Sequence, residues 1–437
     1  MLAQSSLSGP KSFLHRLTLI AERNQLLRNM GWIASAEMVS RIGRIVAAII
    51  LARTLDAYAF GIAALALTVF ELVRLFCENG IGASVVRAAD KDLDATANTA
   101  HQLMWIICLA LAGIQAGIGL VTATVFGAAE LGAMIAVLSG VYLIMPFGVV
   151  HGFVLQREER FRHLAAVTAT QTTSDHILTA LLALSGFGAW AIVLPKLLTA
   201  PIWLIGIRRG RPWERNDAAG TLPATSILQF ALPVLGAEIA SACRDHADKM
   251  IVSAFLGIEA LGVYYFAFNA GLGLSSSLNR AINGALYPHL CKSRSLGENI
   301  GKKFDRLFQK SAAALGGIYL LQAGAALFYV PILFGRDWAA AAPLVAIFCL
   351  SGPARLAVDA ARALSRAEGR SGREMAIAGG FATITLIGLG LNVESGLQQA
   401  ISAMTVSCFI GAALGLVVAR CNSPKTNSET QLKGKVS

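Results

Sequence analysis

The sequence predicts an all-α integral membrane protein with about twelve transmembrane helices. Of its 437 residues, 55% are hydrophobic and only 14% are charged, and the mean hydropathy is +0.60. A soluble protein is normally about one-quarter charged. Apolar segments recur along the chain, each with about the 20 residues that a helix needs to cross the hydrocarbon core of a bilayer. The short alternating segments typical of a transmembrane β-barrel are absent from the sequence.

The expected spans follow one another with short polar connections. Residues 1–29 precede them and are expected to form a cytoplasmic amphipathic segment, because Leu14, Leu17 and Ala21 share one helical face. The spans cover approximately residues 30–51, 59–77, 102–126, 131–155, 164–185, 188–207, 226–255, 261–290, 308–334, 339–362, 374–391 and 397–420.

Basic residues are distributed unevenly between the connections. The connections after odd-numbered spans hold only Arg53 and Arg336. The even connections, both tails and the span ends next to them hold 27 of the 37 Lys and Arg residues. The positive-inside rule therefore places both termini in the cytoplasm. The same distribution accounts for the net charge of +11 without nucleic-acid binding. The seven cysteines lack metal-ligand spacing and are expected to be packing residues.

The chain contains an internal repeat. When it is shifted by 201 residues, positions 36–66 match 237–267 at eight of 31 places, one of them Gly61 with Gly262. The shift equals six spans, an even number, so both halves would share one orientation, as in transporters whose substrate site lies between parallel repeats. We expect two pseudo-symmetric six-helix lobes around a central cavity. The expected domains are an N-lobe at residues 30–207 (helices 1–6), a cytoplasmic linker at 208–225, a C-lobe at 226–420 (helices 7–12) and a cytoplasmic tail at 421–437.

Charged residues inside the spans mark the candidate site. Each ionised side chain at the centre of a spanning helix costs roughly 2.5–3.5 kcal/mol on insertion scales, so it should face protein or a water-filled cavity. Arginine matches the geometry of phosphate. The residues expected to bind an anionic headgroup are Arg41, Arg44, Arg244, Lys249 and Arg280.

Acidic side chains and a histidine in the spans could titrate and couple transport to an ion. The candidates for ion coupling are Glu37, Asp245, His246, Asp248 and Asp175. The alternative is a set of structural salt bridges, in which Asp248 and Lys249 neutralise one another. Asp175 is as consistent with a core pair as with a relay. Lys196, after Pro195, could reach the cavity or extend to an interface; Arg355, Asp359 and Arg362 are expected at the cytoplasmic interface.

The sequence carries no recognisable catalytic motif. HExxH, GxSxG and a phosphate-cradling glycine loop are all absent. We therefore expect a protein that is not an enzyme and that holds neither a cofactor nor a metal.

Four segments together resemble a known family. They are LARTLDAYAFGIAALAL (51–67) with its second-half counterpart DKMIVSAFLGIEALGVYYFAFN (248–269), VLQREERFRHLAAVTATQTTSD (154–175), GFGAWAIVLPKLL (186–198) and VPILFGRDWAAAAPLVAIFCLSGPARL (330–356). The set resembles the Wzx-type polysaccharide flippases of the multidrug/oligosaccharidyl-lipid/polysaccharide exporter superfamily. The likeness extends over about residues 25–375, and the LQRE-x-RF and FG-x-x-W segments are its most specific parts.

The resemblance implies two six-helix lobes around a cationic cavity in the bacterial inner membrane. It implies translocation of an undecaprenyl-pyrophosphate-linked oligosaccharide by alternating access, for exopolysaccharide or O-antigen export. A coupling ion, proton or sodium, and the polysaccharide polymerase and glycosyltransferases of the same pathway would be partners. In related flippases, charges on the first helices of each lobe are thought to contact the headgroup, which here would mean Arg41, Arg44, Arg244 and Lys249.

Two other functions fit a polytopic chain less well. A multidrug exporter of the same superfamily would need a cavity with acidic and aromatic residues for cationic drugs. A membrane-bound polysaccharide polymerase would need a sizeable external loop with catalytic residues, and none is present in the sequence. A structural role in scaffolding other export enzymes remains compatible with the sequence.

Overall fold

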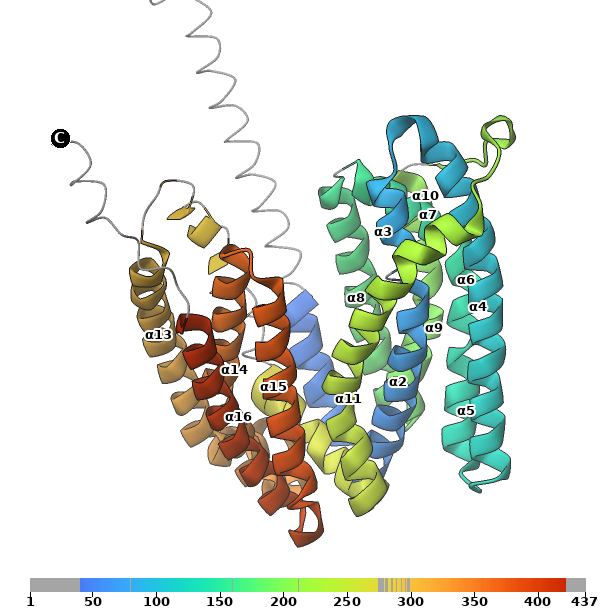
Figure 1. Cartoon of the computed structure of the whole chain (residues 1–437). Helices are drawn as coiled ribbons and strands as arrows, with labels where there is room; N and C mark the ends of the chain where they lie inside the picture. The colour runs from blue at the N-terminus through green and yellow to red at the C-terminus, as the bar shows by residue number, and fades with distance from the viewer. Residues whose placement is uncertain are drawn as a thin grey trace, which may run out of the picture.

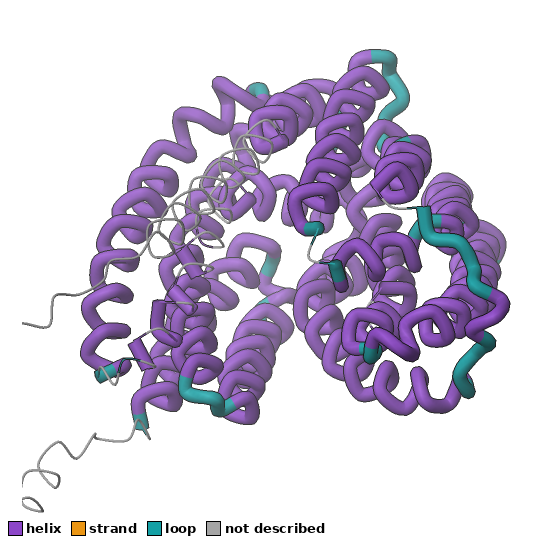
Figure 2. Tube along the Cα trace, turned by 90° about the horizontal axis from the view of Figure 1, so that it is seen from above, coloured by secondary structure: helices purple, strands orange, loops and turns teal. Residues whose placement is uncertain are grey.

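The computed structural model describes residues 40–421, apart from 79, 159, 211, 274–278, 280–281, 284–285, 288, 292, 295 and 297–298, and it does not describe the side chains of residues 230–245. Within these residues the chain is helical, with short loops and no strand (Figure 2). Eight helical segments of the described chain are long and apolar enough to span a membrane. The fold class is therefore confirmed, and the count of twelve helices is consistent with the structure.

The first half of the described chain begins with a helix over residues 40–54. It continues with α2 (Ala57–Glu78), α3 (Gly80–Arg87), η1 (Asp90–Asp92), α4 (Leu93–Thr124), α5 (Ala129–Leu138), α6 (Gly140–Ile144), η2 (Met145–Phe147), α7 (Val149–Arg157), α8 (Phe161–Leu184), α9 (Trp190–Leu198), α10 (Ala200–Gly210) and η3 (Asp217–Ala219).

The second half is built in the same way, with two π-helical segments, η4 and η5. Its elements are α11 (Ala224–Phe268), η4 (Asn269–Gly273), α13 (Ile300–Tyr329), η5 (Val330–Phe334), η6 (Arg336–Ala341), α14 (Ala342–Ala367), α15 (Ser371–Gly390), η7 (Val393–Ser395) and α16 (Leu397–Arg420).

Several observed boundaries differ from the expected spans for physical reasons. The fourth expected span is interrupted around Pro146, because proline cannot donate its backbone hydrogen bond. Helix α4 begins at Leu93, nine residues before the expected start, because its first turns are polar and pack against the linker. There the Asn98 amide donates to the Asn216 and Gly220 carbonyls, each at 2.8 Å. A hydropathy pattern detects only the apolar part of such a helix.

Helix α11 joins the expected seventh and eighth spans through a break at Gly257, whose φ of +85° favours glycine. The segment of α11 that follows the break, residues 258–268, is the repeat counterpart of the first half of α2.

The LQRE-x-RF segment ties together the helix ends on one side of the molecule. Its Arg157 donates to the carbonyls of Val86 and Ala88 at the end of α3 and pairs with Asp90. Its Arg160 donates to the carbonyl of Gly210 at the end of α10, at 2.7 Å. Carbonyls at the end of a helix lack intrahelical partners, so these arginines satisfy them. The motif therefore fixes the relative positions of α3, α7, α8 and α10.

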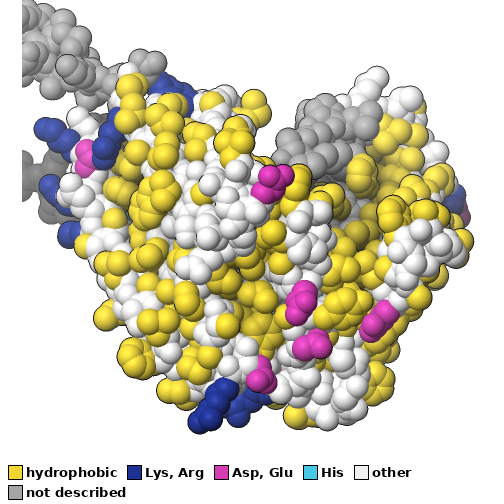
Figure 3. Space-filling model, turned by 90° about the horizontal axis from the view of Figure 1, so that it is seen from below, with side chains coloured by type: hydrophobic (Ala, Val, Ile, Leu, Met, Phe, Trp, Pro, Cys, Tyr) yellow, Lys and Arg dark blue, Asp and Glu magenta, His cyan; other side chains and the backbone are white. Residues whose placement is uncertain are grey.

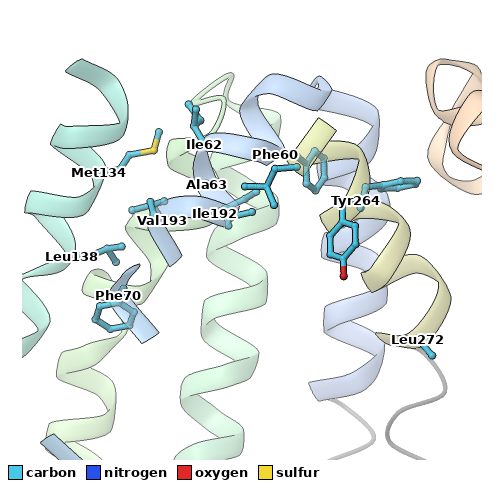
Figure 4. Packing of buried hydrophobic residues seen from close by; sticks show 14 of the residues in the cluster. Phe60, Ile62, Ala63, Phe70, Met134, Leu138, Ile192, Val193, Tyr264 and Leu272 are labelled. Atoms are coloured by element: carbon cyan, nitrogen blue, oxygen red, sulfur yellow. The ribbon is translucent and has the colours of Figure 1, made fainter. Parts of the chain in front are cut away.

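The helices form two bundles that converge at one end of the molecule. Helices α4–α10 lie together on one side and α13–α16 on the other, and α2 packs along α11 between them (Figure 1). The bundles diverge toward the end at which the described chain stops (Figure 1). Side chains of α2, α5 and α9, among them Phe70, Leu138 and Val193, meet in the apolar core of the first bundle (Figure 4). The exact limits of the two lobes stay a prediction.

The convergent end is held by a backbone contact between two glycines that the repeat relates. A Cβ atom built on Gly61 would lie 2.0 Å from the carbonyl oxygen of Ile258, and one built on Gly262 would lie 1.7 Å from that of Ala57. The repeat shift of 201 residues relates Gly61 to Gly262 and Ala57 to Ile258, so the contact follows the pseudo-symmetry. Only glycine permits two helices to approach so closely. We call this contact the glycine crossing.

Aromatic and arginine side chains extend the closure around the glycine crossing. The Phe266 and Trp338 rings stack at 4.0 Å between centroids, and Phe60 packs edge-on against Trp338 at 5.2 Å. The indole of Trp338 donates to the Ala52 carbonyl at 2.6 Å, and the guanidinium of Arg53 donates to the carbonyls of Ile332 and Leu333, each at 2.9 Å.

Figure 3 shows the molecule from this end, with acidic side chains spread across a largely hydrophobic surface. The exposed acidic residues of the loops at this end include Asp56, Glu259 and Asp337.

Candidate functional site

A cavity of about 220 Å³ lies between the two halves of the chain, next to the convergent end. The helix over residues 40–54, α2, α8 and α9 line it from the first half, and the end of α11, η4 and η5 line it from the second. Most of its wall is apolar. Its polar side chains are Arg44, Asp175, His176, Thr179, Lys196 and Asn269. We call it the central cavity.

A buried ion pair forms one side of the central cavity. The Lys196 ammonium lies 2.8 Å from Oδ2 of Asp175, which is 8% exposed, and Lys196 is 36% exposed. The pair joins α8 to α9, and Pro195 precedes the lysine inside α9. The other carboxylate oxygen of Asp175 has no hydrogen-bond partner in the described residues. Desolvated charges require partners, so the pairing explains how both side chains lie among apolar helices.

Arg44 reaches the central cavity from the helix over residues 40–54. Its guanidinium donates to the carbonyl of Gly273 at 2.9 Å, which links the first span to η4 in the second half. In a π-helix the backbone hydrogen bonds follow a different spacing from that of an α-helix, and carbonyls of η4 also accept hydrogen bonds from side chains. The Gln322 amide donates to the Gly271 carbonyl at 2.8 Å, and the Tyr329 hydroxyl donates to the Ala270 carbonyl at 3.2 Å.

The charges of the central cavity favour an anion. Arg44 and Lys196 carry two positive charges, and Asp175 carries one negative charge that Lys196 already contacts. Among the described side chains, the remaining excess of one positive charge lies in a largely apolar surrounding, where electrostatic interactions are strong. Guanidinium groups present several donors in a fork that matches phosphate oxygens.

A second group of charges lies on the other side of the 258–268 segment. Asp248 and Lys249 are neighbours on α11, with Lys249 Nζ 3.2 Å from Asp248 Oδ1. The Tyr264 hydroxyl donates to Asp248 Oδ2 at 2.6 Å. Phe268 and Arg355 line the same cavity as Asp248, which measures about 180 Å³ and lies between α11, α14, α15 and α16. We call it the second cavity.

The structure brings some of the residues expected from the sequence into these cavities. Arg44 and Asp175 line the central cavity, and Asp248 lines the second, where it contacts Lys249. Arg41 is half-buried, one turn before Arg44.

The remaining expected site residues are not placed in either cavity. His246 is half-buried on α11, two residues before Asp248. Glu37 and Arg280 lie outside the described residues, and the side chains of Arg244 and Asp245 are not described. The binding and coupling roles of all these residues stay predictions.

Two features escaped the sequence analysis. The first is the pairing of Asp175 with Lys196, which depends on how α8 and α9 are rotated against each other. The second is the position of Arg355. Helix α14 extends to Ala367, five residues beyond the expected end, so Arg355 lies 12 residues or about 18 Å from the end of its helix, and its place relative to the interface stays a prediction. The sequence contained one indication of this position, because Arg355 is separated by many residues from the basic residues that follow α14.

Within the described residues, no group of three or more His, Cys, Asp or Glu side chains is arranged to hold a metal ion.

Comparison with known proteins places the chain in a family. The sequence profile of a family described as "Polysaccharide biosynthesis protein" matches residues 50–343, about two-thirds of the chain. The chain belongs to this family of polysaccharide biosynthesis proteins. The matched range includes Asp175, Lys196 and Lys249, begins after Arg44 and ends before Arg355. The resemblance to polysaccharide transporters that the sequence segments indicate is confirmed.

Curated relatives of this family are similar over about three-quarters of the chain. The succinoglycan biosynthesis transport protein ExoT of Rhizobium meliloti (strain 1021) is 25% identical over 348 residues, which are 77% of this chain and 68% of that protein. The lipopolysaccharide biosynthesis protein WzxC of Escherichia coli (strain K12) is 22% identical over 351 residues, 76% of this chain and 67% of that protein.

Solved structures share the fold. The lipid II flippase MurJ in an inward closed conformation has a TM-score of 0.72 at 12% identity and covers 89% of this chain and 87% of its own. An inward-facing multidrug resistance MATE family transporter of the MOP superfamily has a TM-score of 0.64 at 14% identity and covers 91% and 96%. At these identities the likeness shows the architecture, and this family member is a multi-pass membrane protein with a transporter fold.

Proposed function

We propose that the chain is a flippase that moves an undecaprenyl-pyrophosphate-linked oligosaccharide across the bacterial inner membrane by alternating access. The observation that carries the proposal is the net positive charge of the described side chains of the central cavity, Arg44, Lys196 and Asp175. Membership of a polysaccharide biosynthesis family and the transport role in the name of its relative ExoT support the same substrate class.

The central cavity receives the diphosphate of the substrate. A volume of about 220 Å³ suits the diphosphate and not the whole oligosaccharide, so the sugars lie beyond the cavity and the isoprenoid chain stays in the bilayer. Arg44 gives up its hydrogen bond to the Gly273 carbonyl and donates to phosphate oxygens instead, and the Lys196 ammonium contacts both Asp175 and the phosphate. Hydrogen bonds with an ionised donor or acceptor are about twice as strong as those between neutral groups, and this difference favours the exchange.

Translocation separates the glycine crossing. The positive-inside rule assigns the convergent end, with the Arg53 and Trp338 contacts, to the outer side of the membrane. The conformation described here is then closed outside, and both termini are cytoplasmic. After the headgroup enters from the cytoplasm, the bundles rock, the glycine crossing opens and the headgroup leaves to the outer leaflet.

Directional transport needs an energy source, which we assign to a proton or sodium gradient. Asp175 is the coupling candidate of the central cavity, because one of its oxygens lacks a hydrogen-bond partner in the described residues. The chain would act without catalysis of its own, beside the glycosyltransferases and polymerase of its pathway. Export of cationic drugs, the alternative suggested by the MATE fold, is disfavoured by the positive charge of the central cavity.

Purified protein in proteoliposomes tests this proposal. We expect the full-length chain to expose a fluorescent lipid-linked oligosaccharide to an impermeant quencher on the opposite side of the membrane, and not to transport a cationic dye. Arg44→Gln should slow flipping at least ten-fold, and Arg44→Lys should restore part of it, since the lysine keeps the charge and loses the guanidinium fork.

Arg306→Gln is the matched control for loss of a positive charge, because Arg306 is exposed on α13. Transport of the dye without flipping of the lipid-linked oligosaccharide would support the multidrug alternative. Unchanged flipping by Arg44→Gln would contradict the assigned role of the central cavity.

A further inference from the structure

The second cavity contains a guanidinium for which no described residue supplies an acceptor. Arg355 makes no hydrogen bond or ion pair with any described residue, and its Nε atom is buried. The guanidinium makes a cation–π contact with the face of Phe268, with its central carbon 5.7 Å from the ring centroid. A guanidinium carries five N–H donors, and a buried donor without an acceptor is costly. The arrangement leaves the guanidinium donors available to an acceptor outside the described chain, such as water or a bound anion.

The acidic residue of the second cavity is already engaged. Asp248 accepts from the Tyr264 hydroxyl at 2.6 Å, from the Lys249 backbone N–H at 2.8 Å and from the Lys249 ammonium at 3.2 Å. The next acid along α14, Asp359, lies 3.6 Å from Arg362 and is 43% exposed. Neither carboxylate contacts Arg355.

Two cations share one aromatic ring in this cavity. Lys249 Nζ lies 5.4 Å from the centroid of Phe268, and the Arg355 guanidinium carbon lies 5.7 Å from the same centroid. Among the described side chains around this ring, one carboxylate, Asp248, faces the two cations, and of these Arg355 lines the cavity itself. Cation–π contact stabilises a desolvated cation, but it does not satisfy the N–H donors.

We propose that the second cavity is a phosphate-binding site in which Arg355 is the principal donor and Lys249 the second charge. Its volume of about 180 Å³ is ample for the five non-hydrogen atoms of a phosphate group together with water. The forked guanidinium of Arg355 binds two phosphate oxygens, and the Lys249 ammonium binds a third while it keeps its contact with Asp248.

Phosphate at this site has two possible sources, the lipid diphosphate or inorganic phosphate from the cytoplasm. The first source rests on the proposed flippase function and would give the substrate a contact with each half of the chain. Phe268 lines the second cavity, and Tyr265 and Asn269, its neighbours along the same turns, line the central cavity. Both cavities therefore border the same helical segment, so a headgroup that moves between them would change its contacts across that segment.

Calorimetric titration of the purified full-length protein with inorganic phosphate tests the site without transport. We expect Arg355→Gln to weaken phosphate binding about ten- to one hundred-fold, the range for the loss of a charge-assisted pair. Arg355→Lys should retain part of the affinity, and Arg306→Gln, the surface control on α13, should leave phosphate binding intact. Phosphate should also raise the unfolding temperature of the wild type and not that of Arg355→Gln.

A double variant excludes a purely structural role of Arg355. If Arg355 only balances the charge of Asp248, Asp248→Asn combined with Arg355→Gln should recover wild-type phosphate binding and transport, and that recovery would overturn the proposal. If the site binds phosphate, the double variant should remain as weak as Arg355→Gln.

Flipping in proteoliposomes identifies the source of the phosphate. A KM for the lipid-linked oligosaccharide that rises at least ten-fold in Arg355→Gln, in phosphate-free buffer, assigns the site to the lipid diphosphate. Wild-type flipping that depends on added inorganic phosphate, with a dependence that Arg355→Gln lacks, assigns it to the free anion. Absence of flipping by the wild type would refute the proposed function and leave the calorimetric result valid. Unchanged phosphate binding by a folded Arg355→Gln protein would refute the site itself.

Discussion

Replacing Gly262 by alanine should open the convergent end of the molecule. The added Cβ would lie 1.7 Å from the carbonyl oxygen of Ala57, whereas carbon and oxygen atoms in close helix contacts are about 3.3–3.6 Å apart. The two helices must therefore separate by roughly 1.6 Å or more, and such overpacking typically costs about 1–3 kcal/mol. Only the closed conformation bears this cost, because the crossing separates in the alternative state.

A cost of this size changes the equilibrium constant between the closed and the open state by about five- to 150-fold in favour of the open state. Spin labels at Asp56 and Asp337, two exposed positions in the same groove at the convergent end, report the separation by pulsed electron resonance in a cysteine-free background. We expect the short-distance population of the wild type to fall in Gly262→Ala. Gly117→Ala is the matched control, because nothing lies within 4 Å of a Cβ at that position of α4.

An unchanged distance distribution in a folded Gly262→Ala protein would refute the reasoning, since the glycine crossing would then not hold the halves together. Gly61→Ala should act in the same direction through the carbonyl of Ile258. Combining both substitutions should give less than the sum of their effects, because they disturb one contact.

Two further substitutions test the contacts around the site. Lys196→Ala leaves Asp175 buried without its partner and should lower stability by about 3–5 kcal/mol, seen as a lower unfolding temperature. The double variant Asp175→Asn with Lys196→Gln should recover most of this loss. A failure to recover would show that the ion pair is not the main contact of either residue. Arg157→Ala removes the hydrogen bonds to the carbonyls of Val86 and Ala88, so limited proteolysis should cut the α3–α4 connection faster than in the wild type. An unchanged digestion pattern would contradict the role of Arg157 in capping α3.

The membrane fold could be predicted from the sequence because hydropathy and the distribution of basic residues are properties of single segments. Helix ends with polar partners could not: α4 begins early because Asn98 contacts the linker, and no local pattern contains that contact. The pairing of Asp175 with Lys196 depends on the rotation of α8 against α9, which the length and polarity of the spans leave undetermined.

The glycine crossing shows what a repeat can and cannot predict. Gly61 and Gly262 were visible as equivalent positions, but equivalence alone does not say that the two residues meet. The expected tenth span ended five residues before α14 does, so the sequence underestimated how far Arg355 lies from the end of its helix. Charged residues deep in a helix are therefore better judged by their distance from observed helix ends than by the polarity around them.

The most direct test of the proposed function is the rate of flipping of a lipid-linked oligosaccharide by purified wild type and Arg44→Gln in the same proteoliposomes. A positive central cavity that binds the diphosphate predicts rapid flipping by the wild type, flipping at least ten-fold slower with Arg44→Gln, and a normal rate with Arg306→Gln. Equal rates for all three proteins, or none for the wild type, would contradict it.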